Sequence, residues 1–581
     1  MKFIKKIAAA TSAAALISAF AVDLSSASAL ENWAVNYTDD GTTEDGAWDY
    51  FISDESVSYD KHICIFAYNG DETDIVIPSE IEGLPVQRLE DVFCCWTDDS
   101  YYEEFPEAKE IDSYKRPLSS LVIPASVKDS DMSLDFFPHL KKLVFEGDEI
   151  CFHYQSKFKD TAIEELEIPK PLPDWRGSTN LNFANNPELR KVSFKNLGEK
   201  FTIDTPAFAN CPKLTELCFP PECRFIEFGG NSFASTGFTE LDFTQDVDVM
   251  TAAFSHCENL KFLNFRGETQ LHGYSFRNCE SLSDITFKAA PVLSKNAFYG
   301  CNSLENINYD TESGIEGLGF SNCVNLRNIN NEPVFNEESG DFFPDKKDIV
   351  KRDFAAVDNV GFINDYINAT IKKVVAEEIT PDMTDIEKLR VLHDWVCAHT
   401  EYEPNESHYS ALTNHVDSSV FITGTSVCEG YARAMNLLCH EAGIESCYVC
   451  SSDHAWNIVK IGGHWLHTDS TWDDFNKNMD WFLHSDSELT EAGGSHKTWH
   501  LTEPSELHTF QCKTMPVCDC PMGDVNTDGK VGAADLVTYS RYLLGAQEIS
   551  ADDAVLADLN FDGSCDCFDM VSLRKKAVSG T

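Results

Sequence analysis

The amino-acid sequence predicts a multidomain protein in which a solenoid-like repeat array precedes an α+β domain and a small all-α domain. Three observations predict this order. The chain has 581 residues, which is too long for one hydrophobic core. A phenylalanine recurs every 22 residues from Phe254 to Phe320, whereas helical and strand patterns alternate farther along the chain. Two similar aspartate-rich loops follow near the C-terminus.

The first residues are typical of a secretory signal peptide. Lys2, Lys5 and Lys6 precede an apolar run over residues 7–22, and an Ala-Ser-Ala motif follows at 27–29. No later apolar stretch is long enough to cross a bilayer. We therefore expect a secreted protein without a membrane span.

Charge and cysteine content narrow the expected partners and the expected habitat. The formal net charge is −51, and such a surface repels nucleic acid and anionic membranes. The 21 cysteines would favour disulfides in a secreted protein. Most of them, however, lie in repeats or on apolar faces, where cysteine behaves as a small buried residue. An anaerobic habitat is our hypothesis for reconciling secretion with free thiols.

The repeat unit has the pattern F-x-x-C-x-x-L-x-x-[LI]-x-[FY]. Complete copies begin at Phe254, Phe276 and Phe298, and a partial copy begins at Phe320. One unit cannot bury its apolar face alone, so stacked units would share a core, with a short strand in each unit. The recurring cysteines are expected in this core and not as metal ligands. The pattern resembles bacterial leucine-rich repeats over residues 70–330, which implies a surface that binds a protein or glycan ligand; a rigid spacer is the alternative.

The second half places a cysteine at a helix start. Thr384 and Glu387 form a capping-box pattern before one amphipathic helix. A second helix is predicted to begin at Ser426 or Val427 and to end near Gly443. Cys428 would then lie in the first turn, where the macrodipole and free N–H groups favour a thiolate.

A predicted β-hairpin places a histidine close to an aspartate. Residues 453–474 indicate two strands joined by a two-residue turn at Gly462 and Gly463. In that register His454 and Asp469 are diagonal neighbours on one face. Asp469 would fix the imidazole tautomer while His454 takes the proton of a thiol. His467 shares this face but lies farther from the cysteine, and we expect a structural role for it.

The order Cys428, H-A-W at 454–456 and D-S-T-W at 469–472 resembles the transglutaminase-like cysteine enzyme superfamily. The resemblance covers residues 350–505 and implies a papain-like α+β fold. It also implies that Cys428 is the nucleophile, His454 the general base and Asp469 the residue that orients the base. A thioester would pass its acyl group to water or to an amine, and the sequence does not decide between a peptidase, a deamidase and a transglutaminase. It also assigns no second oxyanion donor.

A second cysteine pair in this region, Cys447 and Cys450, has C-x-x-C spacing. This spacing suggests a zinc or redox site. The segment reads as a strand, however, and a strand points residues i and i+3 to opposite faces. We therefore expect these thiols to pack in the core.

Two loops near the C-terminus have the spacing of calcium-binding loops. Ca²⁺ prefers six to eight oxygen ligands around a tight glycine turn, which Gly529 and Gly563 supply. Each loop is followed by a short apolar helix, predicted over residues 536–544 and 570–577. We expect two Ca²⁺ ions, with the following ligands: Asp524, Asn526, Asp528, Lys530 and Asp535 in the first loop, and Asp558, Asn560, Asp562, Ser564, Asp566 and Asp569 in the second.

With aspartate at position 12 and no helix expected before either loop, this region resembles a type I-like dockerin. The resemblance implies a cohesin module of a scaffold protein as partner, and a cellulosome-associated or cell-surface location. Positions 10 and 11 of the loops help to choose the cohesin in such domains. The two halves differ there, so we expect one binding orientation, with contact residues taken from Ala533, Ala534, Cys567, Phe568, Arg574 and Lys575. Disulfides from Cys518 or Cys520 to Cys565 or Cys567 are an open alternative.

These inferences combine into one expected architecture. The function expected is Ca²⁺-dependent docking of a thiol acyl-transfer enzyme; the alternative is a non-catalytic adhesin or scaffold whose repeats bind the ligand. The expected segments are a signal peptide at 1–29, an N-terminal cap at 30–70, leucine-rich repeats at 71–335, a linker at 336–350, the transglutaminase-like domain at 351–510, a linker at 511–520 and the dockerin at 521–581.

Overall fold

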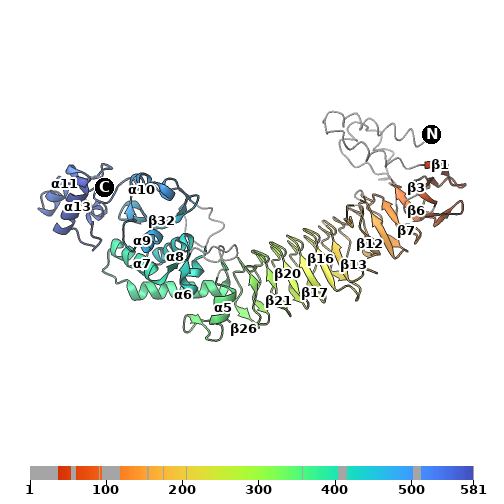
Figure 1. Cartoon of the computed structure of the whole chain (residues 1–581), viewed down its shortest axis with the longest axis horizontal. Coiled ribbons are helices and arrows are strands. Elements are labelled where there is room, and N and C mark those ends of the chain that lie inside the picture. Colours follow the sequence, from red (N-terminus) through yellow and green to blue (C-terminus); the bar gives the residue numbers. More distant parts are fainter. Residues whose placement is uncertain are drawn as a thin grey trace, which may run out of the picture. The chain divides into compact units, whose positions relative to one another are not determined.

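The chain divides into two compact units, Met1–Asn196 and Leu197–Thr581. Figure 1 shows the helices and strands of the described residues, coloured along the sequence. Among the described residues, none of the helices has the length and apolar character needed to span a bilayer. The predicted signal peptide lies outside the described residues. The computed structural model describes residues 37–53, 61–90, 92–93, 118–135, 137–153, 156–174, 176–204, 206–355, 357–403, 415–501 and 512–579.

The N-terminal unit contains two main sheets. One runs β1-β2-β3-β6-β8-β10-β12, antiparallel up to β3 and parallel from there on, with β5 paired to β6. The other is the parallel sheet β4-β7-β9, and β11 pairs with β13 in the same sense. The strands are β1 (Tyr37–Thr42), β2 (Trp48–Ser53), β3 (His62–Tyr68), β4 (Asp74–Val76), β5 (Glu80–Ile81), β6 (Leu84–Glu90), β7 (Ser120–Ile123), β8 (Asp129–Asp131), β9 (Lys142–Phe145), β10 (Glu149–Phe152), β11 (Glu165–Ile168), β12 (Lys170–Leu172) and β13 (Lys191–Phe194).

The second unit begins with two six-stranded sheets that run along the repeats. The sheet from β17 to β26 contains the strand predicted for each repeat. The sheet β14-β16-β18-β20-β22-β24 was not predicted. The strands of this region are β14 (Lys200–Ile203), β15 (Glu216–Cys218), β16 (Phe225–Phe228), β17 (Glu240–Phe243), β18 (Asp246–Val249), β19 (Phe262–Phe265), β20 (Thr269–Leu271), β21 (Asp284–Phe287), β22 (Val292–Leu293), β23 (Asn306–Asn308), β24 (Glu316–Gly317), β25 (Asn328–Ile329) and β26 (Glu332–Pro333).

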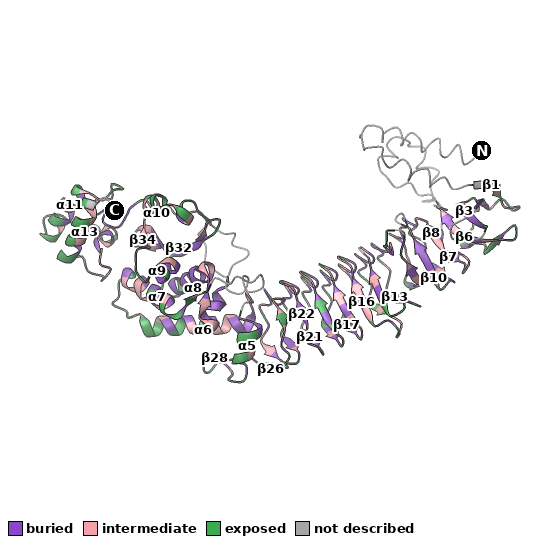
Figure 2. Cartoon of the chain, viewed as in Figure 1, coloured by how far each residue is buried: buried purple, intermediate pink, exposed green. Residues whose placement is uncertain are grey.

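The repeat phenylalanines and cysteines form the core between these two sheets. The rings of Phe254 and Phe276 stack with centroids 5.2 Å apart, and Phe298 and Phe320 repeat this spacing. Each cysteine thiol donates to a carbonyl one repeat earlier, as Cys279 Sγ does to the Phe254 oxygen at 3.3 Å. Both residue types are fully buried. Figure 2 colours the strands of this array by burial. The cysteines are therefore core residues, as predicted.

The segment 336–350, predicted as a linker, is instead part of the fold. It holds the hairpin strand β28 (Asp341–Phe342), which pairs with β27 (Phe335–Asn336), and the start of helix α5 (Lys347–Asp353). The Phe342 ring stacks on Tyr366 with centroids 4.2 Å apart. This aromatic contact orders a stretch whose polar composition suggested a linker.

An α+β domain follows, built on the antiparallel sheet β34-β33-β32-β31-β35 with helix α8 packed on β31 and β32. The predicted capping box at Thr384 and Glu387 is present. The helices are α6 (Gly361–Glu378), α7 (Asp385–His399), π-helix η6 (Ser419–Thr423), α8 (Cys428–Glu441), α9 (Ser470–Asn476), α10 (Asp486–Ala492) and 3₁₀-helix η7 (Gly494–His496). The strands are β29 (Glu401–Tyr402), β30 (Thr425–Ser426), β31 (Ser446–Cys450), β32 (Ala455–Ile461), β33 (His464–Thr468), β34 (Phe482–His484) and β35 (His500–Leu501).

The segment predicted as the second linker, residues 511–520, also packs on this domain where it is described. Cys518 is fully buried with Trp456 and Cys447, and its N–H donates to Asp486 at 3.2 Å. Burial of this cysteine explains why the segment is not a free linker. Within the described ranges, no disulfide joins two cysteines, so the proposed clasp at Cys518 and Cys520 does not form in this structure.

The C-terminal domain is small and helical. It contains α11 (Ala533–Leu543), α12 (Ala551–Ala554), 3₁₀-helix η8 (Val555–Ala557) and α13 (Cys567–Ser579). Its core is formed by Val525, Tyr539, Ala557 and Leu573. The short helical turns of α12 and η8 lead into the second loop, whereas the sequence pattern predicted no helix before either loop. Ser550 caps α12, since its hydroxyl accepts the N–H of Asp553 at 3.0 Å.

Candidate functional sites

Cys428 is the first residue of helix α8. Its neighbour Val427 is extended and forms the N-cap position, so Cys428 lies in the first turn as predicted. The apolar face of the helix, including Tyr431 and Met435, is buried and fixes the helix axis. The Cys428 side chain remains partly exposed. The sulfur is therefore reached by solvent at the positive end of a helix dipole.

The predicted hairpin register is confirmed. Ile461 pairs with His464 and Asn457 with Thr468, around a turn at Gly462 and Gly463. Its predicted length is wrong, because the second strand ends at Thr468 and Ser470 begins helix α9. The residues D-S-T-W at 469–472 begin a helix instead of continuing the strand, because Asp469 caps the N-terminus of that helix.

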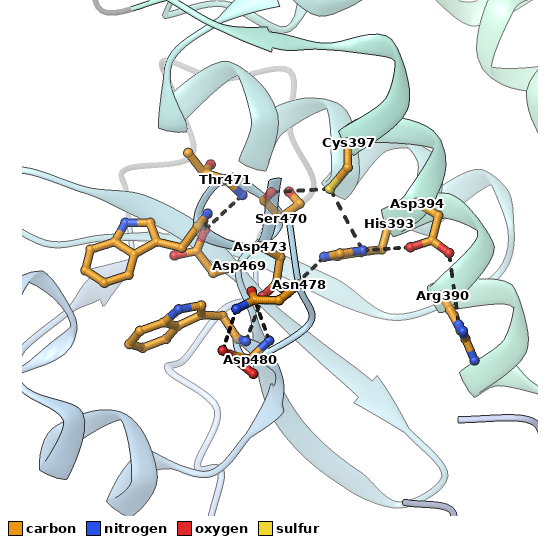
Figure 3. Close-up of polar contacts among 12 residues, drawn as sticks. Arg390, His393, Asp394, Cys397, Asp469, Ser470, Thr471, Asp473, Asn478 and Asp480 are labelled. Carbon is orange, nitrogen blue, oxygen red and sulfur yellow. Dashed lines mark hydrogen bonds and ion pairs between the residues drawn. The ribbon is translucent and has the colours of Figure 1, made fainter. Parts of the chain in front are cut away.

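Asp469 is both the N-cap of α9 and the partner of His454. Its Oδ1 accepts the backbone N–H groups of Thr471 and Trp472 at 3.0 and 3.2 Å (Figure 3). Its Oδ2 lies 2.6 Å from His454 Nε2. The backbone donors hold the carboxylate in one orientation, so its second oxygen is aimed at the imidazole.

Cys428 lies within electrostatic reach of the His454–Asp469 pair. Burial disfavours the charged imidazole, but Asp469 and the nearby Cys428 sulfur outweigh it and raise the pKa of His454 to about 10. The same ring charge holds the pKa of Asp469 at about 2 despite full burial. Because an ionised carboxylate only accepts hydrogen bonds, His454 Nε2 carries a proton and Nδ1 is left for the sulfur.

Two residues of this site were not found from the sequence. His496, in η7, is fully buried and its Nε2 lies 2.8 Å from the same Asp469 oxygen. Tyr402, in β29, has its pKa raised by burial and by the charges of Cys428 and Asp469. Neither residue lies in a motif, because His496 is 27 positions after Asp469 and Tyr402 follows a helix end.

The other predicted assignments in this domain hold. Trp456 Nε1 donates to His467 Nδ1 at 3.0 Å, and His467 Nε2 contacts Asp486 at 2.8 Å, which makes His467 a satisfied core residue. Cys447 packs in one core cluster and Cys450 in another, on the opposite face of β31. The C-x-x-C pair is therefore divided between two faces.

A second polar cluster supports α9 from the side of helix α7 (Figure 3). His393 Nε2 contacts Asp473 Oδ2 at 3.1 Å, and both side chains are fully buried. Cys397 Sγ lies 3.9 Å from His393 Nδ1 and 3.4 Å from the Ser470 carbonyl oxygen. This cluster ties α7 to the helix that Asp469 caps.

The C-terminal loops match the requirements of Ca²⁺. In each loop the carboxylates at positions 1 and 12 are buried, as Asp524 and Asp535 are in the first. Backbone N–H groups hold them, for example Gly529 N–H on Asp524 Oδ2 at 2.7 Å. Burial, Asp569 and Asp562 raise the pKa of Asp558 to about 6. Crowded buried carboxylates of this kind need a cation, and an oxygen-only donor set fits calcium.

The residues predicted to contact a partner lie on the surface of this domain. Phe568 is 68% exposed, which is unusual for a large apolar side chain. The six predicted contact residues are all exposed, namely Ala533, Ala534, Cys567, Phe568, Arg574 and Lys575.

Comparison with known protein families identifies three regions of the chain. Residues 114–228, 139–261, 179–304 and 226–350 match the BspA type leucine rich repeat region, with six copies. Residues 373–470 match the transglutaminase-like superfamily, and residues 522–576 match the dockerin type I domain. The chain joins leucine-rich repeats, a transglutaminase-like domain and a dockerin. The dockerin implies docking to a cohesin and binding of Ca²⁺.

Individual similar proteins cover parts of the chain. The kyphoscoliosis peptidase of Mus musculus is 24% identical over 174 residues, which are 25% of this chain and 26% of that protein. The Homo sapiens protein is 25% identical over 180 residues, which are 25% of this chain and 27% of that protein. The chain therefore spans about a quarter of the length of these curated relatives.

Two solved structures are similar to different regions. A leucine rich cell surface protein from Faecalibacterium prausnitzii is 18% identical, covers 50% of this chain and 94% of its own, and has a TM-score of 0.24. A putative cysteine protease from Cytophaga hutchinsonii is 20% identical, covers 18% of this chain and 37% of its own, and has a TM-score of 0.15.

Proposed function

We propose that the transglutaminase-like domain transfers acyl groups through a thioester on Cys428. The observation that carries this proposal is the His454–Asp469 contact at 2.6 Å, on a ring that lies near enough to Cys428 for the sulfur to raise its pKa. The three residues supply the parts of a thiol catalyst: a nucleophile, a base and a group that orients the base. The catalytic roles of Cys428, His454 and Asp469 are part of this proposal.

The first half-reaction forms the thioester. The proton of Cys428 Sγ is held on His454 Nδ1, in keeping with the raised pKa of that ring, and the thiolate sulfur attacks the carbonyl carbon of a carboxamide or peptide bond. When the tetrahedral intermediate collapses, the C–N bond breaks and His454 returns its proton to the leaving nitrogen. The Cys428 backbone N–H at the helix start is one donor for the developing oxyanion. Tyr402 is the residue that we propose as the second donor.

The second half-reaction decides the type of enzyme. Water as acceptor gives an acid product, which is proteolysis or deamidation depending on the bond first broken. A lysine amine as acceptor gives an isopeptide bond. In each case His454 takes a proton from the acceptor, and Cys428 leaves as a thiolate that the imidazolium reprotonates.

Alkylation by iodoacetamide tests the site without knowledge of the substrate. We expect Cys428 to react near neutral pH at least tenfold faster than Cys218, an exposed cysteine of the repeat array that serves as internal control. His454→Ala should slow the Cys428 reaction and leave the Cys218 rate unchanged. Equal rates at both cysteines in the wild-type protein would favour the alternative of a non-catalytic adhesin.

The acceptor is identified by mass spectrometry. The Ca²⁺-loaded protein is incubated with a panel of caseins, with and without a primary amine. Fragments indicate proteolysis, a shift of about +1 Da indicates deamidation, and addition of the amine indicates transamidation. Cys428→Ala is the matched control, and equal product with this variant would exclude a thioester on Cys428.

We further propose that the dockerin places this enzyme on the cohesin of a secreted scaffold, in a cellulosome-type assembly. Bound Ca²⁺ would order the two loops and so fix the helices that follow them. The two halves differ in their exposed residues, Ala533 and Ala534 against Cys567 and Phe568, which supports one binding orientation. Phe568→Asp should then weaken cohesin binding much more than Ala534→Asp. Equal losses would contradict the single orientation.

A further inference from the structure

The N-terminal unit brings a separate cysteine, histidine and aspartate together on one sheet face. Strands β8 and β10 are parallel neighbours, and Asp129 pairs with Cys151 in their register. His153 follows Cys151 by two residues, so its side chain points to the same face. Asp129 Oδ1 lies 3.4 Å from His153 Nε2. One donor atom from each of these residues lies within 4.8 Å of the other two.

We propose that Asp129, Cys151 and His153 bind a divalent transition-metal ion, with Zn²⁺ as the best chemical match. Thiolate, imidazole and carboxylate are the three side-chain ligand types that zinc uses, whereas Ca²⁺ and Mg²⁺ prefer oxygen alone. Ligand atoms about 2.0–2.3 Å from a tetrahedral zinc lie roughly 3–4 Å from one another. The 3.4 Å contact between Asp129 and His153 already has this spacing.

The surroundings of the cluster favour a cation. Asp131 is two residues after Asp129 on β8 and therefore shares its face. Asp131 Oδ1 is buried, and within the described chain it has no hydrogen-bond partner. Arg88, which pairs with Asp129 in the next strand, has its guanidinium 2.9 Å from Glu90. Glu90 thus places one carboxylate against Arg88, and Asp129 and Asp131 add two more on strand β8.

Two other groups of ligand-type side chains in the described chain are less suited to bind a metal ion. His467, near Asp486 and Cys518, uses both ring nitrogens in hydrogen bonds, one of them with Trp456. The group around Asp469 belongs to the site described above. By contrast, among the described residues the His153 ring makes one hydrogen-bond contact, and its partner is Asp129. A metal ion would replace that contact, with three protein ligands and a fourth position left for water or a bound molecule.

Cobalt is the probe for this site, because a thiolate bound to Co²⁺ gives a charge-transfer band that oxygen ligands do not. Full-length reduced protein is first saturated with Ca²⁺ to fill the dockerin loops and is then titrated with Co²⁺. We expect a thiolate band that saturates at one Co²⁺ per chain and disappears when Zn²⁺ is added. Cys151→Ser should abolish the band, and Asp129→Asn should weaken Co²⁺ binding by at least about tenfold.

Cys518→Ser is the matched control, because Cys518 belongs to the rival group, and this variant should keep the full band. A wild-type protein without a thiolate band, or a band that survives Cys151→Ser, would overturn the proposal. If Cys151→Ser does not fold, X-ray absorption of the wild-type zinc form decides. One sulfur at about 2.3 Å among nitrogen and oxygen ligands supports the site, and a shell without sulfur refutes it.

Discussion

His454 and His496 contact the same oxygen atom, Asp469 Oδ2, at 2.6 and 2.8 Å. The other oxygen of this carboxylate accepts two backbone N–H groups at the start of α9. Asp469 is therefore held from three directions, and His454 is aligned through it. His496 acts on His454 through this shared carboxylate, which makes it a positioning residue for the proposed catalysis.

Replacing His496 with phenylalanine should lower kcat and leave KM nearly unchanged. The aromatic ring keeps its packing, but Asp469 loses one donor, and a hydrogen bond to a charged group contributes about 1.5–3 kcal/mol. The expected loss in kcat is about tenfold or more. Because His496 helps to hold the pKa of Asp469 at about 2, the acid limb of the Cys428 alkylation profile should move to higher pH. His440→Phe, at an exposed position near the end of α8, is the control. An unchanged acid limb would exclude the positioning role.

Replacing Tyr402 with phenylalanine tests the proposed oxyanion donor. Burial raises the pKa of the Tyr402 hydroxyl, and the charges of Cys428 and Asp469 raise it further. Loss of one such donor costs about 10²–10³ in kcat in other enzymes. We expect a smaller but clear loss in kcat here, with the alkylation rate of Cys428 preserved, because iodoacetamide forms no tetrahedral intermediate. Tyr366→Phe removes a hydroxyl that contacts the Phe421 carbonyl and is the matched control.

The ion pair of His454 predicts a specific pH dependence of stability. The pKa of His454 is raised from its ordinary value of 6.5 to about 10 in the folded protein. Its stabilising contribution is therefore complete below about pH 6.5 and is lost as the pH rises through about 10. The expected loss is on the order of a few kcal/mol. Thermal unfolding of the wild type and of His454→Gln between pH 6 and 10.5 measures it, and parallel pH curves for the two proteins would contradict the assignment.

The residues of the site could be predicted from the sequence better than the structure that surrounds them. The two-glycine turn determines which residues of the two strands face each other, so the contact between His454 and Asp469 can be predicted from the pattern alone. The end of the second strand at Thr468 does not follow, because it depends on whether Asp469 finds N–H groups to cap. His496 reaches the site through loops without a regular period. The segments taken as linkers are ordered by single buried contacts, such as that of Cys518, which composition does not reveal.

The buried pair of His393 and Asp473 predicts a large effect on stability. Burial disfavours a charged imidazole, but hydrogen bonds with Asp394 and Asp473 raise the pKa of His393 well above its usual value. Asp473→Ala would leave this charge buried without its partner, which costs about 3–5 kcal/mol. We expect a lower melting temperature of the transglutaminase-like domain. Asp394→Ala, on the exposed side of the same ring, should cost less than about 1 kcal/mol. Equal losses would contradict a structural ion pair at Asp473.

Removal of Ca²⁺ should unfold the dockerin and leave the Cys428 site intact. The buried carboxylates of Asp524, Asp535, Asp558 and Asp569 repel one another when no cation separates them. Chelation is therefore expected to reduce the helical circular dichroism from α11 and α13 and to abolish cohesin binding, and excess Ca²⁺ should restore both. The alkylation rate of Cys428 is the internal control and should not change. Asp524→Asn and Asp558→Asn each remove a ligand from one loop. The number of Ca²⁺ ions bound per chain is therefore expected to be two in the wild type and one in either variant. Full helicity and cohesin binding after chelation would contradict a calcium-dependent dockerin.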